Sequence, residues 1–509
     1  MKYILLSYIL FVSHNLSAQI VWEQNYGGSS IDELVELTGG QNNELLLIGS
    51  TLSNDGDIDS YLGQKDALLI NTNLEGVINW SINIGGTAND EFRSAVQTMD
   101  GDWYVAGKSI STDLDISDGN GSEQGLLCHL SQEGELQWCK TYGEIEDDEF
   151  FTISITPNGN LLLSGAVDNE DLLTETTLRH SNQDFWLLEL SPDGTVIWEK
   201  KFGGSDAEQA LDHVQDDEGN IYICGFAVSN DMDLNINFGL KDIWLLKTDD
   251  QGDILWKKSY GGSSFEEGRK LALYDDILYL AGGSFSNDNT FLDQQIGQED
   301  GIILALSTET GELLNQTNTG GLSADRINDL IIKDDEIIIA GFSKSALNGN
   351  QGYGGTDYWI RAFDAELSPK WTRIFGGSNE EVAHSIVNYN NSLFIGGSSY
   401  SSDQDISESY GLSDIWVLNY DLISKTHNLQ NASIDYLLFK DHILIRSLPN
   451  GPYSYVIFDL LGRPLHTGDF QVNKEDIRIE LSESSFFLLN IVHANQPMLN
   501  YSIKGIINR

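Results

Sequence analysis

Short apolar runs separated by polar turns make up the hydrophobic pattern of this chain. Typical runs are Glu44 to Ile48 and Trp186 to Leu188, and Gly, Asn, Asp or Ser residues flank most of them. Apolar residues do not recur three and four positions apart over several turns, as they would in amphipathic helices. Runs of this length and spacing predict β-strands, and therefore an all-β protein.

One motif recurs along the chain: a Trp, three further residues, usually an aromatic residue, and then Gly-Gly. The first copy is Trp22 to Gly28. The later copies begin 56 to 60 residues apart, at Trp80, Trp138, Trp198, Trp256, Asn315 (a degenerate copy) and Trp371. A second landmark, a polar residue two positions before an apolar run, keeps the same period: Asp66, Gln124, Asp184, Asp242, Asp300, Asp357 and Asp414. Two landmarks in step predict seven repeated structural units.

Each unit contains four runs of strand type. The first follows the Gly-Gly pair, the second ends near a Gly such as Gly49, the third follows the repeating Asp, and the fourth carries the Trp. Tight turns such as Asp100-Gly101 join consecutive runs. This order predicts a four-stranded antiparallel meander.

Such a sheet buries its faces only against copies of itself, which leaves a closed propeller or an open solenoid. The chain opens on a Trp strand at Trp22 and ends its last repeat on a third strand near Tyr420. Every unit has four strands only if the N-terminal strand serves as the fourth strand of the last unit. We therefore predict a seven-bladed β-propeller over residues 19–421, in which the N-terminal strand closes the last blade.

The repeat resembles that of a family of secreted bacterial repeat proteins. The motifs that carry the resemblance are Trp22 to Ser29, Gly49 to Asp57 and Gly411 to Trp416. The resemblance covers residues 20 to about 421 and implies export and a propeller-like fold. It implies no activity.

The N-terminal residues 1–18 have the features of a signal peptide. Lys2 precedes an apolar run from Ile4 to Val12, and Leu16-Ser17-Ala18 forms a small-residue cleavage site. No later apolar run approaches the roughly 18 to 20 residues that span a bilayer. We expect a secreted or outer-surface protein without a membrane span.

The formal charge is −50, from 28 basic and 78 acidic residues. A field of this sign repels nucleic-acid backbones and anionic lipid, so neither is an expected partner. The three cysteines fit neither a zinc site nor a disulfide framework. The expected hairpin register places Cys128 opposite Trp138 and turns Cys139 to the other face. We therefore expect Cys128, Cys139 and Cys224 to be buried thiols.

A polar linker is expected at 422–433 and a small Ig-like β-sandwich at 434–509, because alternating β-type runs resume there. Three segments, Val456 to Arg463, Ser485 to Ile491 and Lys504 to Ile507, resemble the C-terminal sorting domain of type IX secretion cargo. The usual middle Gly-x-Tyr is replaced by Ser485-Phe486-Phe487, and an early Pro-Asn-Pro is missing. The resemblance implies a type IX translocon as a partner. The alternative is an ordinary Ig-like module.

A carboxylate stands four residues after the second Gly in all seven copies. These residues, called here the ring carboxylates, are Asp32, Asp90, Asp148, Glu208, Glu266, Asp325 and Glu381. At the start of the innermost strand they are expected to surround one mouth of the central channel. They could bind a cation or a polyol there, or accept backbone N–H groups from the turns between blades. Their presence in every blade favours the structural role, because sites are usually built asymmetrically on a scaffold.

Alternating aspartates follow the second strand in several copies. They are Asp55, Asp57, Asp59, Asp113, Asp115, Asp231, Asp233, Asp403 and Asp405. Their spacing offers hard oxygens to Ca²⁺, the one possible cofactor, although the terminal Glu of an EF-hand is missing. Hydrogen-bonded Asx turns are the competing interpretation.

The sequence contains no nucleophile elbow, no phosphate loop and no histidine cluster with ligand spacing. Regular blades also argue against a catalytic site, which would be expected to break the repeat. We therefore predict a non-catalytic binding or scaffold protein with an extracellular glycan or protein ligand. The alternatives are an enzyme that acts on extracellular polysaccharide through the ring carboxylates, and a structural adhesion or surface-layer protein.

Overall fold

The computed structural model describes residues 19–421, apart from 59–60, 144–146, 169–182, 235, 292–295, 346–351 and 390–391, together with the backbone of seven strands nearer the C-terminus. The expected signal peptide and linker lie outside the described residues. The chain divides into two units, Met1–Leu422 and Ile423–Arg509.

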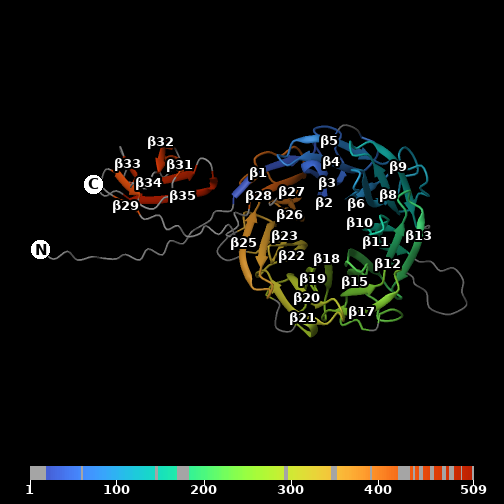
Figure 1. The fold of residues 1–509 in the computed structure, drawn as a ribbon. Helices are drawn as coiled ribbons and strands as arrows, with labels where there is room; N and C mark the ends of the chain where they lie inside the picture. Colours follow the sequence, from blue (N-terminus) through green and yellow to red (C-terminus); the bar gives the residue numbers. More distant parts are fainter. Residues whose placement is uncertain are drawn as a thin grey trace, which may run out of the picture. The chain divides into compact units, whose positions relative to one another are not determined.

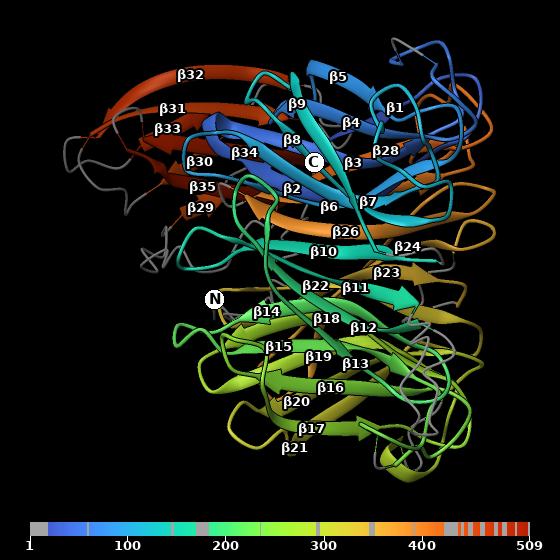
Figure 2. The same ribbon diagram turned by 90° about the vertical axis from the view of Figure 1, so that its right-hand side faces the viewer.

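The first unit is an all-β propeller of seven antiparallel four-stranded blades (Figures 1 and 2). Its described residues contain no α-helix. From the inner to the outer strand the blades are: β2 (Asp32–Gly40), β3 (Glu44–Thr51), β4 (Asp66–Asn73), β5 (Ile78–Ile84); β6 (Asp90–Gln97), β7 (Trp103–Ser109), β8 (Gln124–Leu130), β9 (Leu136–Tyr142); β10 (Glu149–Ile155), β11 (Leu161–Asp168), β12 (Gln183–Leu190), β13 (Val196–Phe202); β14 (Glu208–Gln215), β15 (Ile221–Ala227), β16 (Asp242–Thr248), β17 (Ile254–Tyr260); β18 (Glu266–Tyr274), β19 (Ile277–Ser284), β20 (Asp300–Ser307), β21 (Leu313–Thr319); β22 (Asp325–Lys333), β23 (Glu336–Ser343), β24 (Asp357–Phe363), β25 (Pro369–Phe375); and β26 (Glu381–Tyr389), β27 (Ser392–Ser399), β28 (Asp414–Asp421), β1 (Gln19–Tyr26).

Ring closure occurs in the seventh blade, as predicted. Strand β1 pairs antiparallel with β28, from Tyr26 opposite Ile415 to Gln19 opposite Asp421. The seventh blade therefore combines both ends of the repeat region. Gln19 and Asp421, the two ends of the described ring, therefore lie opposite each other.

The Trp and the aromatic residue of the motif hold the outer turn of the next blade. Trp22 Nε1 donates to the carbonyl of Leu74 at 2.9 Å, and the Tyr26 hydroxyl donates to that of Gly76 at 2.7 Å. Gly76 has a φ of +81°, and a Cβ there would lie 3.2 Å from the Trp22 ring. Only glycine therefore fits beneath the indole.

The degenerate copy changes both partners of this contact together. Asn315 replaces the Trp, and its side chain donates to the carbonyl of Glu366 at 2.8 Å. The turn residue that faces it is Leu367, whose side chain is buried and whose φ is +61°. The smaller Asn leaves room for the leucine, which replaces the apolar volume lost with the indole.

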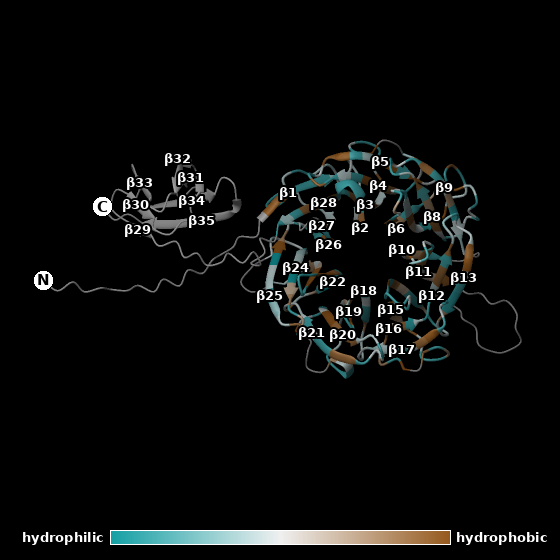
Figure 3. Cartoon of the chain, in the orientation of Figure 1, coloured by the Kyte–Doolittle hydropathy of each residue, from teal (hydrophilic) through white to brown (hydrophobic). Residues whose placement is uncertain are grey.

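The second and third strands of each blade form the core. The side chains of β4, β16 and β28 are buried along nearly their whole length, whereas β13 and β21 are largely accessible to solvent. The outer strands show both hydrophilic and hydrophobic stretches in Figure 3. The ring is thus held by apolar packing between neighbouring sheets.

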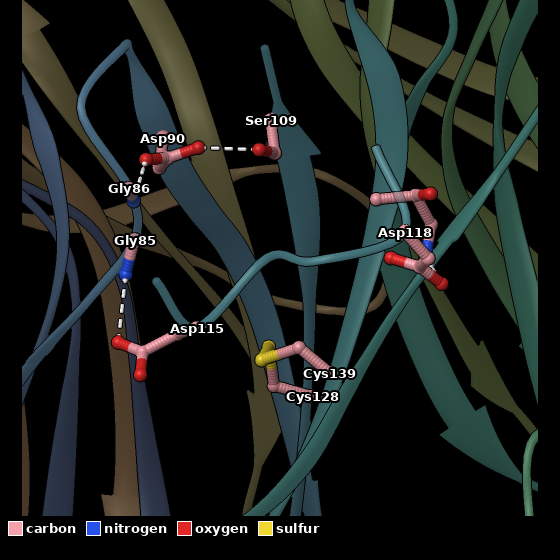
Figure 4. Close-up of a disulfide and its surroundings, with 9 residues drawn as sticks. Gly85, Gly86, Asp90, Ser109, Asp115, Asp118, Cys128 and Cys139 are labelled. Carbon is pink, nitrogen blue, oxygen red and sulfur yellow. Dashed lines mark hydrogen bonds between the residues drawn. A yellow bond between two sulfur atoms is a disulfide. The ribbon is translucent and has the colours of Figure 1, made fainter. Parts of the chain in front are cut away.

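The prediction that Cys128 and Cys139 are thiols is wrong. They lie directly opposite each other on β8 and β9 and form a disulfide (Figure 4). A register shift between His129 and Leu130 inserts one extra residue into β9, so that His129 faces Trp138. The expected turn omitted this bulge, and one residue of slip changes which side chains meet. Cys224 is a buried free thiol, as expected.

The second unit contains two antiparallel sheets. One has the order β29 (Tyr436–Leu438), β30 (His442–Ile445), β33 (Ile477–Glu480), and the other β32 (Pro464–Val472), β31 (Gly451–Phe458), β34 (Phe486–His493), β35 (Gln496–Ile506). An Ig-like sandwich stays a prediction for this unit. No helix in the described part of the chain has the length and apolarity needed to cross a membrane.

Candidate functional site: the central channel

The ring carboxylates stand at or next to the start of the innermost strands, but all seven side chains are buried. Asp90 is representative (Figure 4): it accepts the N–H of Gly86 at 2.8 Å and the hydroxyls of Ser109 and Ser111, the latter at 2.8 Å. Glu208 accepts the N–H of Gly204 at 2.7 Å. None of the seven side chains is exposed to the channel, because the turns between blades take up their oxygens. This geometry supports the structural interpretation.

The aspartates after the second strand hold the same Gly-Gly loops from outside. Asp55 accepts the N–H of Ser29 at 2.7 Å, and Asp57 accepts that of Gly27 at 3.2 Å. The pairs Asp113 and Asp115, Asp231 and Asp233, and Asp403 and Asp405 make equivalent bonds. Asp59 lies outside the described residues.

These bonds explain the alternating aspartates as turn acceptors without a cation. Within the described ranges, no group of three or more His, Cys, Asp or Glu side chains is arranged to hold a metal ion. Calcium binding stays a prediction.

The repeating Asp before the third strand approaches the ring carboxylate of the next blade. Asp357 accepts the N–H of Tyr353 at 3.0 Å through one oxygen, while its other oxygen is buried without a hydrogen-bond partner among the described residues. Burial, with the charge of Glu381 added, raises the pKa of Asp357 to about 7. Burial likewise raises the pKa of Asp242 to about 6 and that of Glu208 to about 7.

We expect the raised carboxyl pKa values to cost the propeller stability as the pH rises from 5 to 8, and to outweigh the opposite contribution of the buried His213 and His384, whose pKa values are lowered to about 3 and about 4. A carboxyl group whose pKa is raised above its unfolded value of about 4 stabilises the fold fully below that value, and this stabilisation is lost as the pH rises through the folded pKa. Asp242, Glu208 and Asp357 place this loss near pH 6 to 7. Thermal unfolding followed by circular dichroism should give a higher Tm at pH 5. Asp357→Asn should reduce the difference, and a wild-type Tm that rises toward pH 8 would contradict the argument.

Every innermost strand contains a β-bulge at the third residue after its ring carboxylate. On β2 the register shifts between Leu34 and Glu36, which leaves Val35 as the extra residue, and the other six strands shift at the equivalent place. The seven extra residues, called here the tip residues, are Val35, Arg93, Phe151, Leu211, Arg269, Asn328 and His384. Bulges re-aim side chains next to functional sites.

All seven tip residues line one cavity of about 370 Å³ at the centre of the ring. Its volume falls in the range of about 300 to 1,000 Å³ that is typical of ligand pockets. Each tip side chain is half-buried, so each is accessible from the cavity. The seven innermost strands surround this space in Figure 1.

Residues four positions past the ring carboxylates tie neighbouring inner strands together. Glu36 on β2 accepts the N–H of Ala95 on β6 at 3.1 Å, and Asp212 on β14 accepts that of Leu271 on β18 at 2.8 Å. Lys270 has the same position on β18, and its Nζ lies 3.3 Å from the Asp212 carboxylate. The carboxylates at this level are therefore already held by backbone groups and by a lysine.

A belt of compensating pairs connects the blades beside the cavity. The residue before the repeating Asp of one blade meets the residue after the ring carboxylate of the next blade. The pair is Lys65 and Glu91 at 3.1 Å in one interface and Gln183 and Gln209 at 2.5 Å in another. Glu299 and Arg326 form it with the charges reversed. Where both positions are acidic, at Glu123 and Glu149, Lys108 lies 3.0 Å from the first carboxylate and 3.6 Å from the second.

The sequence-based predictions do not include the tip residues, because they rest on positions that stay the same in every repeat. The available signal was the opposite one: the third position after the ring carboxylate carries a different kind of side chain in almost every copy. A regular scaffold that varies at one inward-facing position is typical of a binding site.

Comparisons with known proteins give no family for this chain. No family model matches the sequence, and a search of curated proteins also finds no match. Among solved structures, the chain is similar to the WD40 β-propeller domain of Doa1, with 10% identity, coverage of 79% of this chain and 98% of that one, and a TM-score of 0.42.

Two bacterial structures are also similar to this chain. PorZ is described as a surface component of the type IX secretion system of Porphyromonas gingivalis; it has 10% identity, with 96% of this chain and 61% of that one covered, and a TM-score of 0.41. The extracellular domain of a hybrid two-component system from B. thetaiotaomicron has 12% identity, with 97% and 60% covered, and a TM-score of 0.41. Likenesses at this level carry no argument about this chain.

Proposed function

We propose that this protein is a secreted or cell-surface propeller that binds an extracellular glycan or protein ligand in its central channel, without catalysing a reaction. The observation that carries the proposal is the set of seven bulges, whose side chains all line one cavity and differ in type from blade to blade. The strands behind them remain regular. Natural sites are commonly built in this way, as local variation on a rigid scaffold.

The positions of the carboxylates favour binding over glycoside hydrolysis. A glycosidase needs two carboxyl groups that reach the substrate from opposite sides. The ring carboxylates are buried, and Glu36 and Asp212 are held by backbone N–H groups. Binding therefore uses side chains that still have free groups, whereas hydrolysis would require carboxylates that already hold backbone N–H groups or basic side chains.

A glycan and protein array probed with the mature full-length chain tests this proposal. Val35→Trp places a large ring at a tip position and should remove at least about 90% of the specific signal, because it fills the cavity. Val77→Trp is the matched control, since Val77 lies in an outer turn and is 61% exposed. Equal signals from the two variants would exclude the channel as the site.

The proposal that the protein is exported rests on the C-terminal unit. Its β-type composition and the three motif segments resemble type IX sorting domains, and its two sheets form a unit separate from the propeller. In a host with a type IX system, removal of residues 423–509 should leave the protein in the periplasm with an unchanged Tm for the propeller. Normal export of the truncated chain would refute the sorting role.

A further inference from the structure

The tip residues differ in composition from the rest of the chain. Acidic residues outnumber basic ones by 78 to 28 in the sequence, yet the seven tips include two arginines and no carboxylate. Asn328 and His384 add two further polar groups. The remaining three, Val35, Phe151 and Leu211, are apolar. The ring of tips thus pairs hydrogen-bond donors with an apolar surface, inside a protein of opposite overall charge.

Both arginines keep donors that the protein does not use. Arg93 Nη2 lies 3.1 Å from Glu91 and 3.5 Å from Glu149, and Arg269 Nη2 lies 2.6 Å from Glu267. In each guanidinium the Nε–H is buried and has no hydrogen-bond partner among the described residues. Because Nε is buried, a ligand in the cavity meets the Nη groups of these arginines instead, and each guanidinium has more Nη–H donors than its ion pairs use.

The acidic residues that also line the cavity already have partners within the protein. Glu267 contacts Arg269 and lies 2.5 Å from Lys241. Asp329 accepts the N–H of Ile386 at 2.8 Å, and Glu36 and Asp212 are held as described above. The two guanidinium groups therefore remain the charged donors of the tip ring that have N–H groups left for a ligand.

We propose that the channel binds a carboxylate-bearing sugar, with its carboxylate on Arg93 or Arg269 and its C–H face on Val35, Phe151 and Leu211. This inference rests on the proposed function and names its ligand class. The two Nη groups of a guanidinium present parallel N–H donors that match the two oxygens of a carboxylate. The charge of −50 repels extended polyanions, so the ligand carries isolated carboxylates on an otherwise neutral glycan.

Methyl β-D-glucuronoside and methyl β-D-glucoside test this inference, because they differ only by the carboxylate. Binding to the full-length chain is measured by calorimetry and by the NMR signals of His384. We expect the glucuronoside to bind at least about tenfold more tightly, which corresponds to about 1.4 kcal/mol. Equal affinity for the two sugars, or no binding of the glucuronoside, overturns the inference. Sulfate that binds as tightly as the glucuronoside identifies a general oxyanion site and also overturns it.

Two substitutions of Leu211 distinguish an effect of charge on binding from an effect of the substitution on folding. Leu211→Gln removes the apolar contact with the sugar, whereas Leu211→Glu, of the same size, also places an anion in the tip ring and should bind the glucuronoside at least about tenfold more weakly than Leu211→Gln. Arg269→Lys should also weaken binding, because lysine lacks the fork. If Val35→Trp removes the array signal but Leu211→Glu leaves it intact, the channel is the site and the ligand class is wrong. If Val35→Trp has no effect, both proposals fail.

Discussion

Deletion of residues 19–26 is expected to prevent the ring from closing and to lower the Tm by more than about 10 °C. The deletion removes all of β1 and exposes the edge of β28, and with it the core contacts of Tyr26, which is 1% exposed. It also removes the two hydrogen bonds that hold the outer turn at Gly76 in the first blade. Two blades are therefore weakened by one short deletion.

Differential scanning calorimetry measures this effect, and two comparisons make it specific. Tyr26→Phe removes only the hydroxyl bond to Gly76 and should cost about 1 kcal/mol. A synthetic peptide of residues 19–30 added to the truncated protein should restore part of the Tm, because the edge of β28 remains available for pairing. A truncated chain with wild-type stability would exclude closure by β1 as a source of stability.

Asp90→Ala is expected to lower the free energy of unfolding by about 3 kcal/mol. The substitution leaves the buried N–H of Gly86 and the buried hydroxyls of Ser109 and Ser111 without their common acceptor. A buried donor that loses its partner costs about 1 to 3 kcal/mol, and relaxation of the two serines brings the total to the upper end.

Urea unfolding measures this change, with Asp113→Ala as the control. Asp113 accepts two bonds from Thr87 in the same blade, but these bonds are exposed to solvent. Water replaces them, so the control should cost less than about 1 kcal/mol. Similar losses in both variants would show that burial does not decide the importance of the ring carboxylates.

The channel site could be located from the sequence only in part. The position of the innermost strand follows from the Gly-Gly motif and the ring carboxylate, and both lie where they were expected. The bulge at Val35 and its six counterparts has no sequence signature of its own. Simple alternation therefore could not show that these residues face the cavity, since one extra residue reverses the direction of every later side chain.

The sequence alone determined the fold of the repeat region, because period, turn residues and strand phase are local and appear seven times. The number of blades, their four strands and closure by residues 19–26 all follow from it. Only the tertiary structure decided which side chains meet: the Cys128–Cys139 disulfide, the burial of Asp90 and its equivalents, and the convergence of Arg93 and Arg269 on one cavity. These depend on single-residue shifts in register and on contacts between strands far apart in the chain, which a local pattern does not encode.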